Sequence, residues 1–141
     1  MCDSNNSTNG CNNCIYEILK TILVLQKQAN IGECCLDTCD KNFLGSIPSI
    51  CGYNTRPITL YLKGCCGTRL EMPISRDPAE ATTSPVFRVE KLDNCCCTCR
   101  VLVPTTVEGV TTYTATDSFF TVNIDCICIL KCLSDTLVES L

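Results

Sequence analysis

The sequence predicts a mainly β domain: an antiparallel β-sandwich or small barrel with one N-terminal α-helix and a flexible cysteine-bearing arm. Two observations support this fold class. From residue 57 onward the chain consists of short runs rich in Val, Ile, Thr, Tyr and Phe, separated by Gly, Pro, Asp or Asn, as in small antiparallel β folds. Before that point, one segment places its apolar residues at helical spacing. A chain of 141 residues is long enough to bury a core, and we expect a single domain.

The N-terminal part is predicted to form an arm followed by a helix. Residues 1–13 are rich in Asn, Ser and Thr, a composition typical of flexible segments. Asn12 or Asn13 can cap a helix over residues 14–28, and Glu17 lies in its first turn, where the helix dipole favours an acidic side chain. The apolar residues of this helix form one stripe, which we expect to pack either in the core of the domain or against another subunit: Ile15, Ile18, Leu19, Ile22 and Leu25.

An irregular segment, residues 29–56, separates the helix from the β region. We expect the β-sandwich over residues 57–133 and a short tail over residues 134–141. The strand-like runs cover residues 58–63, 68–74, 86–92, 99–103, 110–116 and 119–129. In the last run alternate residues have the character of a half-buried strand, which predicts that they face the core: Phe120, Val122, Ile124, Cys126 and Cys128.

The most unusual feature of the composition is its cysteine content: sixteen cysteines occur beside no histidine and no tryptophan. A cysteine fraction above about 8–10% is typical of secreted disulfide scaffolds. The chain begins MCDSNNSTNG, which is polar and acidic and lacks the basic and apolar regions of a secretion signal. We therefore expect a chain that is made in a reducing cytoplasm without a signal peptide and then either binds metal or is oxidised later.

The positions of the cysteines favour cross-linking. Two clusters fall where hairpins are expected to turn, one between Gly64 and Gly67 and the other after Asp93 and Asn94. Neighbouring cysteines are poor partners for each other, because a disulfide needs converging Cβ vectors. Each is therefore expected to bridge a distant segment or another molecule, and both alternatives stay open. The cross-linking candidates are Cys2, Cys11, Cys14, Cys34, Cys35, Cys39, Cys51, Cys65, Cys66, Cys95, Cys96 and Cys97.

Four further cysteines lie in the expected strands or at their ends. Cys99, Cys126, Cys128 and Cys132 are predicted to be buried thiols or to bond within the domain.

A structural zinc site is the main alternative use of the thiols. Cys11 and Cys14 have the CxxC spacing of zinc ligands, and Cys34, Cys35 or Cys39 can complete a four-thiolate site. The preferred set is Cys11, Cys14, Cys34 and Cys39, which would stabilise a cytoplasmic binding module. The second half of this set departs from CxxC, and the main prediction includes no metal and no cofactor.

Other classes of function are disfavoured by composition. Without histidine the chain lacks the commonest base for activating a thiol or hydroxyl nucleophile, and it contains no phosphate-binding glycine loop, so we do not expect an enzyme. The carboxylates Asp77, Glu80, Glu90 and Asp93 are scattered, and we expect them to be solvated. The net charge of −4 argues against nucleic acid as a partner. The apolar stretch from residue 15 to 25 is too short and too charged to span a membrane.

Four blocks of the sequence resemble a known family. They are NTRPITLYLKG (54–64), SPVFRVEKLD (84–93), CRVLV (99–103) and VNIDCICILKCL (122–133). In this order they are similar to the cysteine-rich spore coat family, which comprises spore coat proteins Y and Z and exosporium protein Y. The resemblance covers roughly residues 51–133. The clusters at 65–66 and 95–97 are denser than the family pattern, so bridges there are not carried over from it.

The resemblance implies a structural protein of the outermost spore layers, the outer coat or the exosporium. Such proteins are made in the mother cell cytoplasm, assemble into two-dimensional sheets, here expected as hexamers that tile, and become cross-linked by disulfides. The implied partners are other copies of the chain and other coat or exosporium proteins. Arg56, Arg88 and Arg100 lie in or beside the family-like blocks, and we expect them to make ion pairs or subunit contacts.

Overall fold

The computed structural model describes residues 13–29, 53–64, 67–139 and 141. Most of the expected arm and most of the irregular segment lie outside these residues. Cys2, Cys11, Cys34, Cys35, Cys39, Cys51, Cys65 and Cys66 therefore stay predictions.

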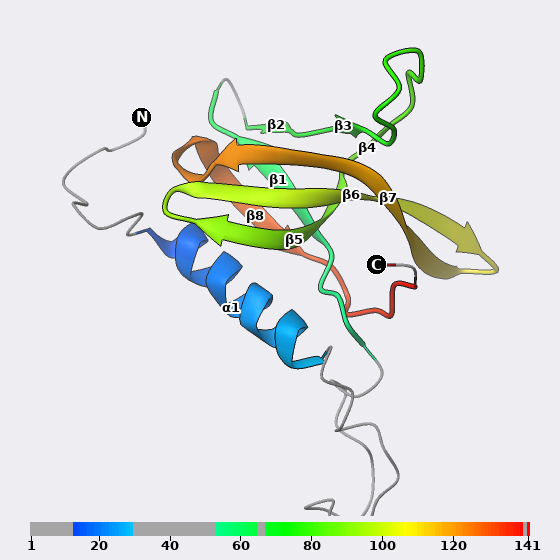
Figure 1. Cartoon of the computed structure of the whole chain (residues 1–141), viewed down its shortest axis with the longest axis horizontal. Helices are drawn as coiled ribbons and strands as arrows, with labels where there is room; N and C mark the ends of the chain where they lie inside the picture. The colour runs from blue at the N-terminus through cyan, green and yellow to red at the C-terminus, as the bar shows by residue number, and fades with distance from the viewer. Residues whose placement is uncertain (1–12, 30–52, 65–66, 140) are drawn as a thin grey trace, which may run out of the picture.

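The described part is mainly β with one N-terminal helix, so the predicted fold class is confirmed. Its main sheet has six antiparallel strands and curls into a half-barrel (Figure 1). The elements, in chain order, are α1 (Cys14–Ala29), β1 (Ile58–Leu62), β2 (Thr68–Arg69), β3 (Met72–Pro73), β4 (Thr83–Ser84), β5 (Val86–Asp93), β6 (Cys96–Val107), β7 (Val110–Asn123), a 3₁₀ turn (Ile124–Cys126) and β8 (Ile127–Cys132).

Helix α1 forms where the sequence predicted it. Asn13 is its cap, because the backbone N–H of Tyr16 donates to Asn13 Oδ1 at 2.8 Å. Ile15, Leu19 and Ile22 are buried against the sheet of their own chain. The within-chain alternative therefore applies to these three residues. Two further members of the predicted stripe are less buried, Ile18 being 40% exposed and Leu25 half-buried, and subunit packing stays a prediction for them.

The main sheet has the order β2-β1-β5-β6-β7, and β8 pairs with the other side of β1. β1 meets β5 at one register position, Ile58 opposite Phe87, whereas β1 and β8 pair over five positions. Consecutive long strands β5, β6 and β7 form two hairpins. In the described residues β7, β8 and the short β2 each pair with one strand, so these three lie at edges of this sheet.

The strand boundaries differ from the predicted ones in several places. The run predicted over 99–103 is the longer strand β6, Cys96–Val107, and β4 was not predicted. The run 68–74 forms two short strands, of which β3 pairs with β4 in a separate sheet. The runs predicted over 110–116 and 119–129 are divided differently: one strand, β7, covers the first run and part of the second. A register shift in β7 lies opposite Arg100–Leu102, and a 3₁₀ turn follows before β8. This turn interrupts the alternation of the strand, so it changes which later residues face the core.

Side chains pack on both faces of the sheet. The larger core joins α1 to one face and includes Leu60, Phe87, Val89 and Val101, all fully buried; Figure 1 shows α1 lying across this face. The rings of Phe87 and Phe120 meet edge to face at 4.7 Å.

A smaller cluster lies on the opposite face, because its strand residues are the immediate neighbours of core residues in β5 and β6. Val86 and Leu102 pack there against Val138, which is 1% exposed. The C-terminal segment predicted as a tail thus contributes a core residue. Two hydrogen bonds fix it: Asn54 Nδ2 donates to the Val138 carbonyl, and the Val138 N–H donates to Asn54 Oδ1, both at 2.9 Å.

Candidate functional site

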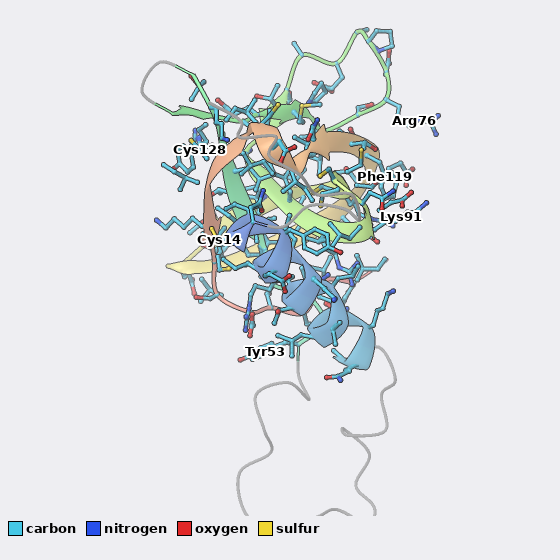
Figure 2. All side chains as sticks on the ribbon, turned by 90° about the vertical axis from the view of Figure 1, so that its left-hand side faces the viewer. Cys14, Tyr53, Arg76, Lys91, Phe119 and Cys128 are labelled. Atoms are coloured by element: carbon cyan, nitrogen blue, oxygen red, sulfur yellow. The ribbon has the colours of Figure 1, made fainter. Side chains whose placement is uncertain are left out.

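The described thiols fall into an exposed and a buried group. Cys14 is exposed at the first position of α1, and Cys96 is exposed at the start of β6. Cys128 and Cys132 are exposed free thiols on the edge strand β8. In Figure 2, Cys14 and Cys128 lie on one side of the molecule and Phe119 lies on the other. Cys132 lines a groove between α1 and β8, next to Ile18.

Cys97 and Cys99 form the buried group. Both are fully buried in the core beneath α1, and their Sγ atoms are 3.6 Å apart. The hydrogen bond with Cys97, together with burial, raises the pKa of Cys99 well above its ordinary value. A protonated thiol is a poor nucleophile, so the raised pKa of Cys99 disfavours its disulfide exchange, and burial shields both thiols.

The structure corrects two expectations about the cysteines. Cys97 was predicted to lie at an accessible hairpin tip, and this is wrong. The turn contains only Asn94 and Cys95, so β6 already begins at Cys96, which lies opposite Asp93. Cys97 is therefore the second residue of β6, and its side chain faces the core. The predicted burial is wrong for Cys126, Cys128 and Cys132, which are exposed. Cys126 lies in the 3₁₀ turn, and Cys128 falls at the register shift that follows the buried Ile127. Cys132 lies opposite the buried Ile58, on the face that carries α1, but at the open edge of the groove beside the helix. The burial predicted for Cys99 is confirmed.

Cys95 has a different state from its neighbours. It lies in the β5–β6 turn, is half-buried and is disulfide-bonded. None of the other seven described cysteines is its partner. No disulfide therefore joins two described residues.

Two of the three family-block arginines share one carboxylate. Glu90 Oε2 accepts hydrogen bonds from Arg88 Nη1 at 2.7 Å and from Arg100 Nε at 3.2 Å. Arg88 is 5% exposed and also donates from Nε to Thr55 Oγ1 at 2.8 Å. Arg100 lies over the ring of Phe119, 4.5 Å from its centroid. This cluster joins β5, β6, β7 and the segment before β1, and we infer that it helps to fix the register of the curled sheet.

Glu90 was expected to be solvated, and that expectation is wrong. Its side chain is 21% exposed because it lies between two arginines. Arg88 and Glu90 are two residues apart on β5, and such residues share a face of a strand. Their opposite charges at this spacing are the signal in the sequence that identifies the pair.

Arg56 makes a separate ion pair with Asp135. Its Nε and Nη2 donate to the two carboxylate oxygens at 2.7 and 2.9 Å, a bidentate arrangement. The hydrogen bond to Arg56 lowers the pKa of Asp135, and the same bond raises the pKa of Arg56. Gln26 connects this pair to the helix, since its Oε1 accepts from the Arg56 N–H and its Nε2 donates to the Val89 carbonyl. Gln26 and Asp135 were not predicted from the sequence, because no local pattern marks them.

The zinc alternative depends on residues outside the described part, apart from Cys14. Among the described residues no three His, Cys, Asp or Glu side chains are grouped as metal ligands would be. The described part also contains no helix with the length and hydropathy needed to cross a membrane.

Comparison with known proteins gives one result. The model of a family described as spore coat protein Z matches residues 2–135. This span contains all four of the blocks on which the resemblance was based, and the suspected family is thereby confirmed. Neither the curated proteins nor the solved structures yield a significant match.

Proposed function

The chain belongs to the spore coat protein Z family, and on that premise we propose that it is a self-assembling structural protein of the outer spore coat or the exosporium. Family membership itself indicates a structural protein of the spore coat. The proposal adds that copies of the chain pack into a two-dimensional lattice, with hexameric rings as the repeating unit. It further adds that disulfides between copies, and between this chain and other coat proteins, make the lattice permanent.

The exposed thiols carry this proposal. Cys14, Cys96, Cys128 and Cys132 are free and exposed, and they lie at a helix start, a strand start and a sheet edge. A thiol in such a place can meet a thiol of a neighbouring molecule without any rearrangement of the core. The arrangement supports disulfides between molecules, because these four thiols are exposed and free.

We infer that disulfides lock the assembly rather than drive it. The chain is proposed to be synthesised in the mother cell cytoplasm, where thiols stay reduced. The two cores and the ion pairs described above hold the described part of the domain together without a disulfide between two of its residues, so the domain is expected to fold and associate while reduced. Exposure to oxygen then joins copies that are already in contact. Each bond removes entropy from the dissociated state, and many bonds together make disassembly slow.

The test is electron microscopy of the full chain expressed in a reducing cytoplasm. We expect ordered rings or sheets in the presence of reductant, and after oxidation sheets that withstand boiling until reductant is added. A chain that stays monomeric under both conditions would refute self-assembly. Ordered sheets that fall apart on boiling after oxidation would refute the disulfide lock and leave self-assembly standing.

A further inference from the structure

The outer part of the β6–β7 hairpin projects from the body of the molecule, and we name residues 103–115 the β-arm (Figure 1). β5 pairs with β6 only as far as Leu102, so beyond that position the ribbon is two strands wide. Every residue from 104 to 112 is exposed, including the apolar Val107 at 63% and Val110 at 64%. A two-stranded ribbon in water is marginally stable, and a third strand with its hydrogen bonds would stabilise it.

The turn of the β-arm determines which backbone groups point outward. Glu108 and Gly109 both have positive φ, 52° and 80°, as in a two-residue type I′ turn. Val107 and Val110 therefore form the hydrogen-bonded closing pair, and the next pair, Thr106 with Thr111, is not hydrogen-bonded through its backbone. The 2.9 Å contact between the Oγ1 atoms of these threonines agrees with this, since side chains are closer in such pairs.

The two edges of the β-arm are not equivalent. In a pair that is not hydrogen-bonded, the backbone N–H and C=O groups point away from the partner strand. On the β6 edge the residues with such outward backbone groups are Thr106 and Pro104, and Pro104 has no N–H to donate. On the β7 edge they are Thr111 and Tyr113, and both keep the donor and the acceptor. From residue 110 to 115 this edge has no charge and no proline, the devices by which edge strands usually avoid pairing. No described strand pairs with the β7 edge, which is thus open to another strand, whereas the β6 edge is blunted.

We propose that the β7 edge of the β-arm pairs with the same edge of a second copy, antiparallel about a two-fold axis. An edge without charge meets its own copy without like-charge repulsion. In the register that places Thr111 opposite Tyr113 of the second copy, Glu108 lies opposite Thr116 rather than opposite a carboxylate. Val110 then lies opposite Thr114, and cross-strand pairs of β-branched residues stabilise antiparallel sheets.

This inference rests on the proposed self-assembly and names one of its contacts. Head-to-tail contacts close a ring, and a ring needs a further contact to reach the next ring. A two-fold contact through a projecting arm has the geometry to join neighbouring rings into a sheet.

The experiment compares Thr111→Pro with Thr106→Pro in the full chain under reductant. The two positions are cross-strand partners and both are exposed, and both variants lose the same hydroxyl contact. They differ only in the edge that loses its outward donor. Because the axis doubles each change, Thr111→Pro removes two backbone hydrogen bonds per contact, and we expect self-association measured by light scattering to weaken about tenfold or more. Thr106→Pro is expected to change it by no more than about twofold.

A second measurement on the unaltered chain keeps the test independent of how the variants fold. Hydrogen exchange of the Thr111 and Tyr113 amides should slow in the assembled form relative to the monomer. If the chain associates but both variants behave alike, or if these amides exchange equally fast in both forms, the β-arm contact is refuted and self-assembly is not. If the unaltered chain never associates, both are refuted.

Discussion

Replacing Glu90 by Gln tests whether the shared carboxylate of the arginine cluster stabilises the curled sheet. The carboxylate accepts from Arg88 at 2.7 Å and from Arg100 at 3.2 Å, and the side chains of these arginines are 6% and 16% exposed. The amide keeps an acceptor but loses the charge, and charge-assisted hydrogen bonds are about twice as strong as neutral ones, so about 1 kcal/mol is lost for each bond. Two poorly solvated guanidinium groups are then left without a counter-charge. Together these effects predict a destabilisation of about 2–3 kcal/mol.

The assay is urea unfolding under reductant, followed by circular dichroism, with Glu71→Gln as the matched control. Glu71 faces Arg69 at 3.9 Å with both side chains about half exposed, and such a pair contributes at most about 0.5 kcal/mol. In thermal unfolding, Glu90→Gln should lower the melting temperature by about 6–10 °C. If Glu90→Gln and Glu71→Gln cost the same, the cluster would not be the register-fixing element that we infer.

Two further predictions follow from the thiols and from the second ion pair. In the folded, reduced chain a maleimide should label the exposed Cys128 quickly, and it should label the buried Cys97 and Cys99 only after denaturation. Mass spectrometry of the labelled peptides measures the labelling rates. Equal rates for the three thiols would contradict the assigned burial. The pKa of Asp135 is lowered by Arg56, so the stability of this pair is present above the ordinary aspartate pKa of 3.8 and is lost as the pH falls through the lower folded value. Since about a third of each side chain is exposed, the free energy of unfolding lost on acidification through this pair is at most about 1 kcal/mol. In urea unfolding measured across the acidic pH range, Asp135→Asn should remove this pH-dependent contribution.

The sequence predicted features that depend on neighbours along the chain. The helix needs only the cap at Asn13 and the spacing of Ile15, Leu19 and Ile22, and it forms at the predicted place. The β-rich texture and the turn after Asp93 are local in the same sense. The family blocks are local strings of residues, and the family they suggested is confirmed.

Burial of the thiols depended on register, and register is not local. A strand exposes alternate residues, so one added or removed position exchanges the two faces. The turn uses only Asn94 and Cys95, which turns Cys97 inward, and the 3₁₀ turn before Ile127 turns Cys128 outward. Neither shift has a signal in the cysteine spacing, and the environments predicted for these two thiols were therefore wrong.

By itself, the sequence determined that the chain has a helix over residues 14–28 followed by a β-rich region and belongs to the spore coat family, because cap residues, periodicity and family blocks are read from neighbouring positions. Only the tertiary structure decided which thiols reach solvent, that Glu90 lies between Arg88 and Arg100, and that the β7 edge of the β-arm is open. These features arise where segments far apart in the chain meet. Their positions are determined by strand pairing and by bulges, which no local pattern of residues specifies.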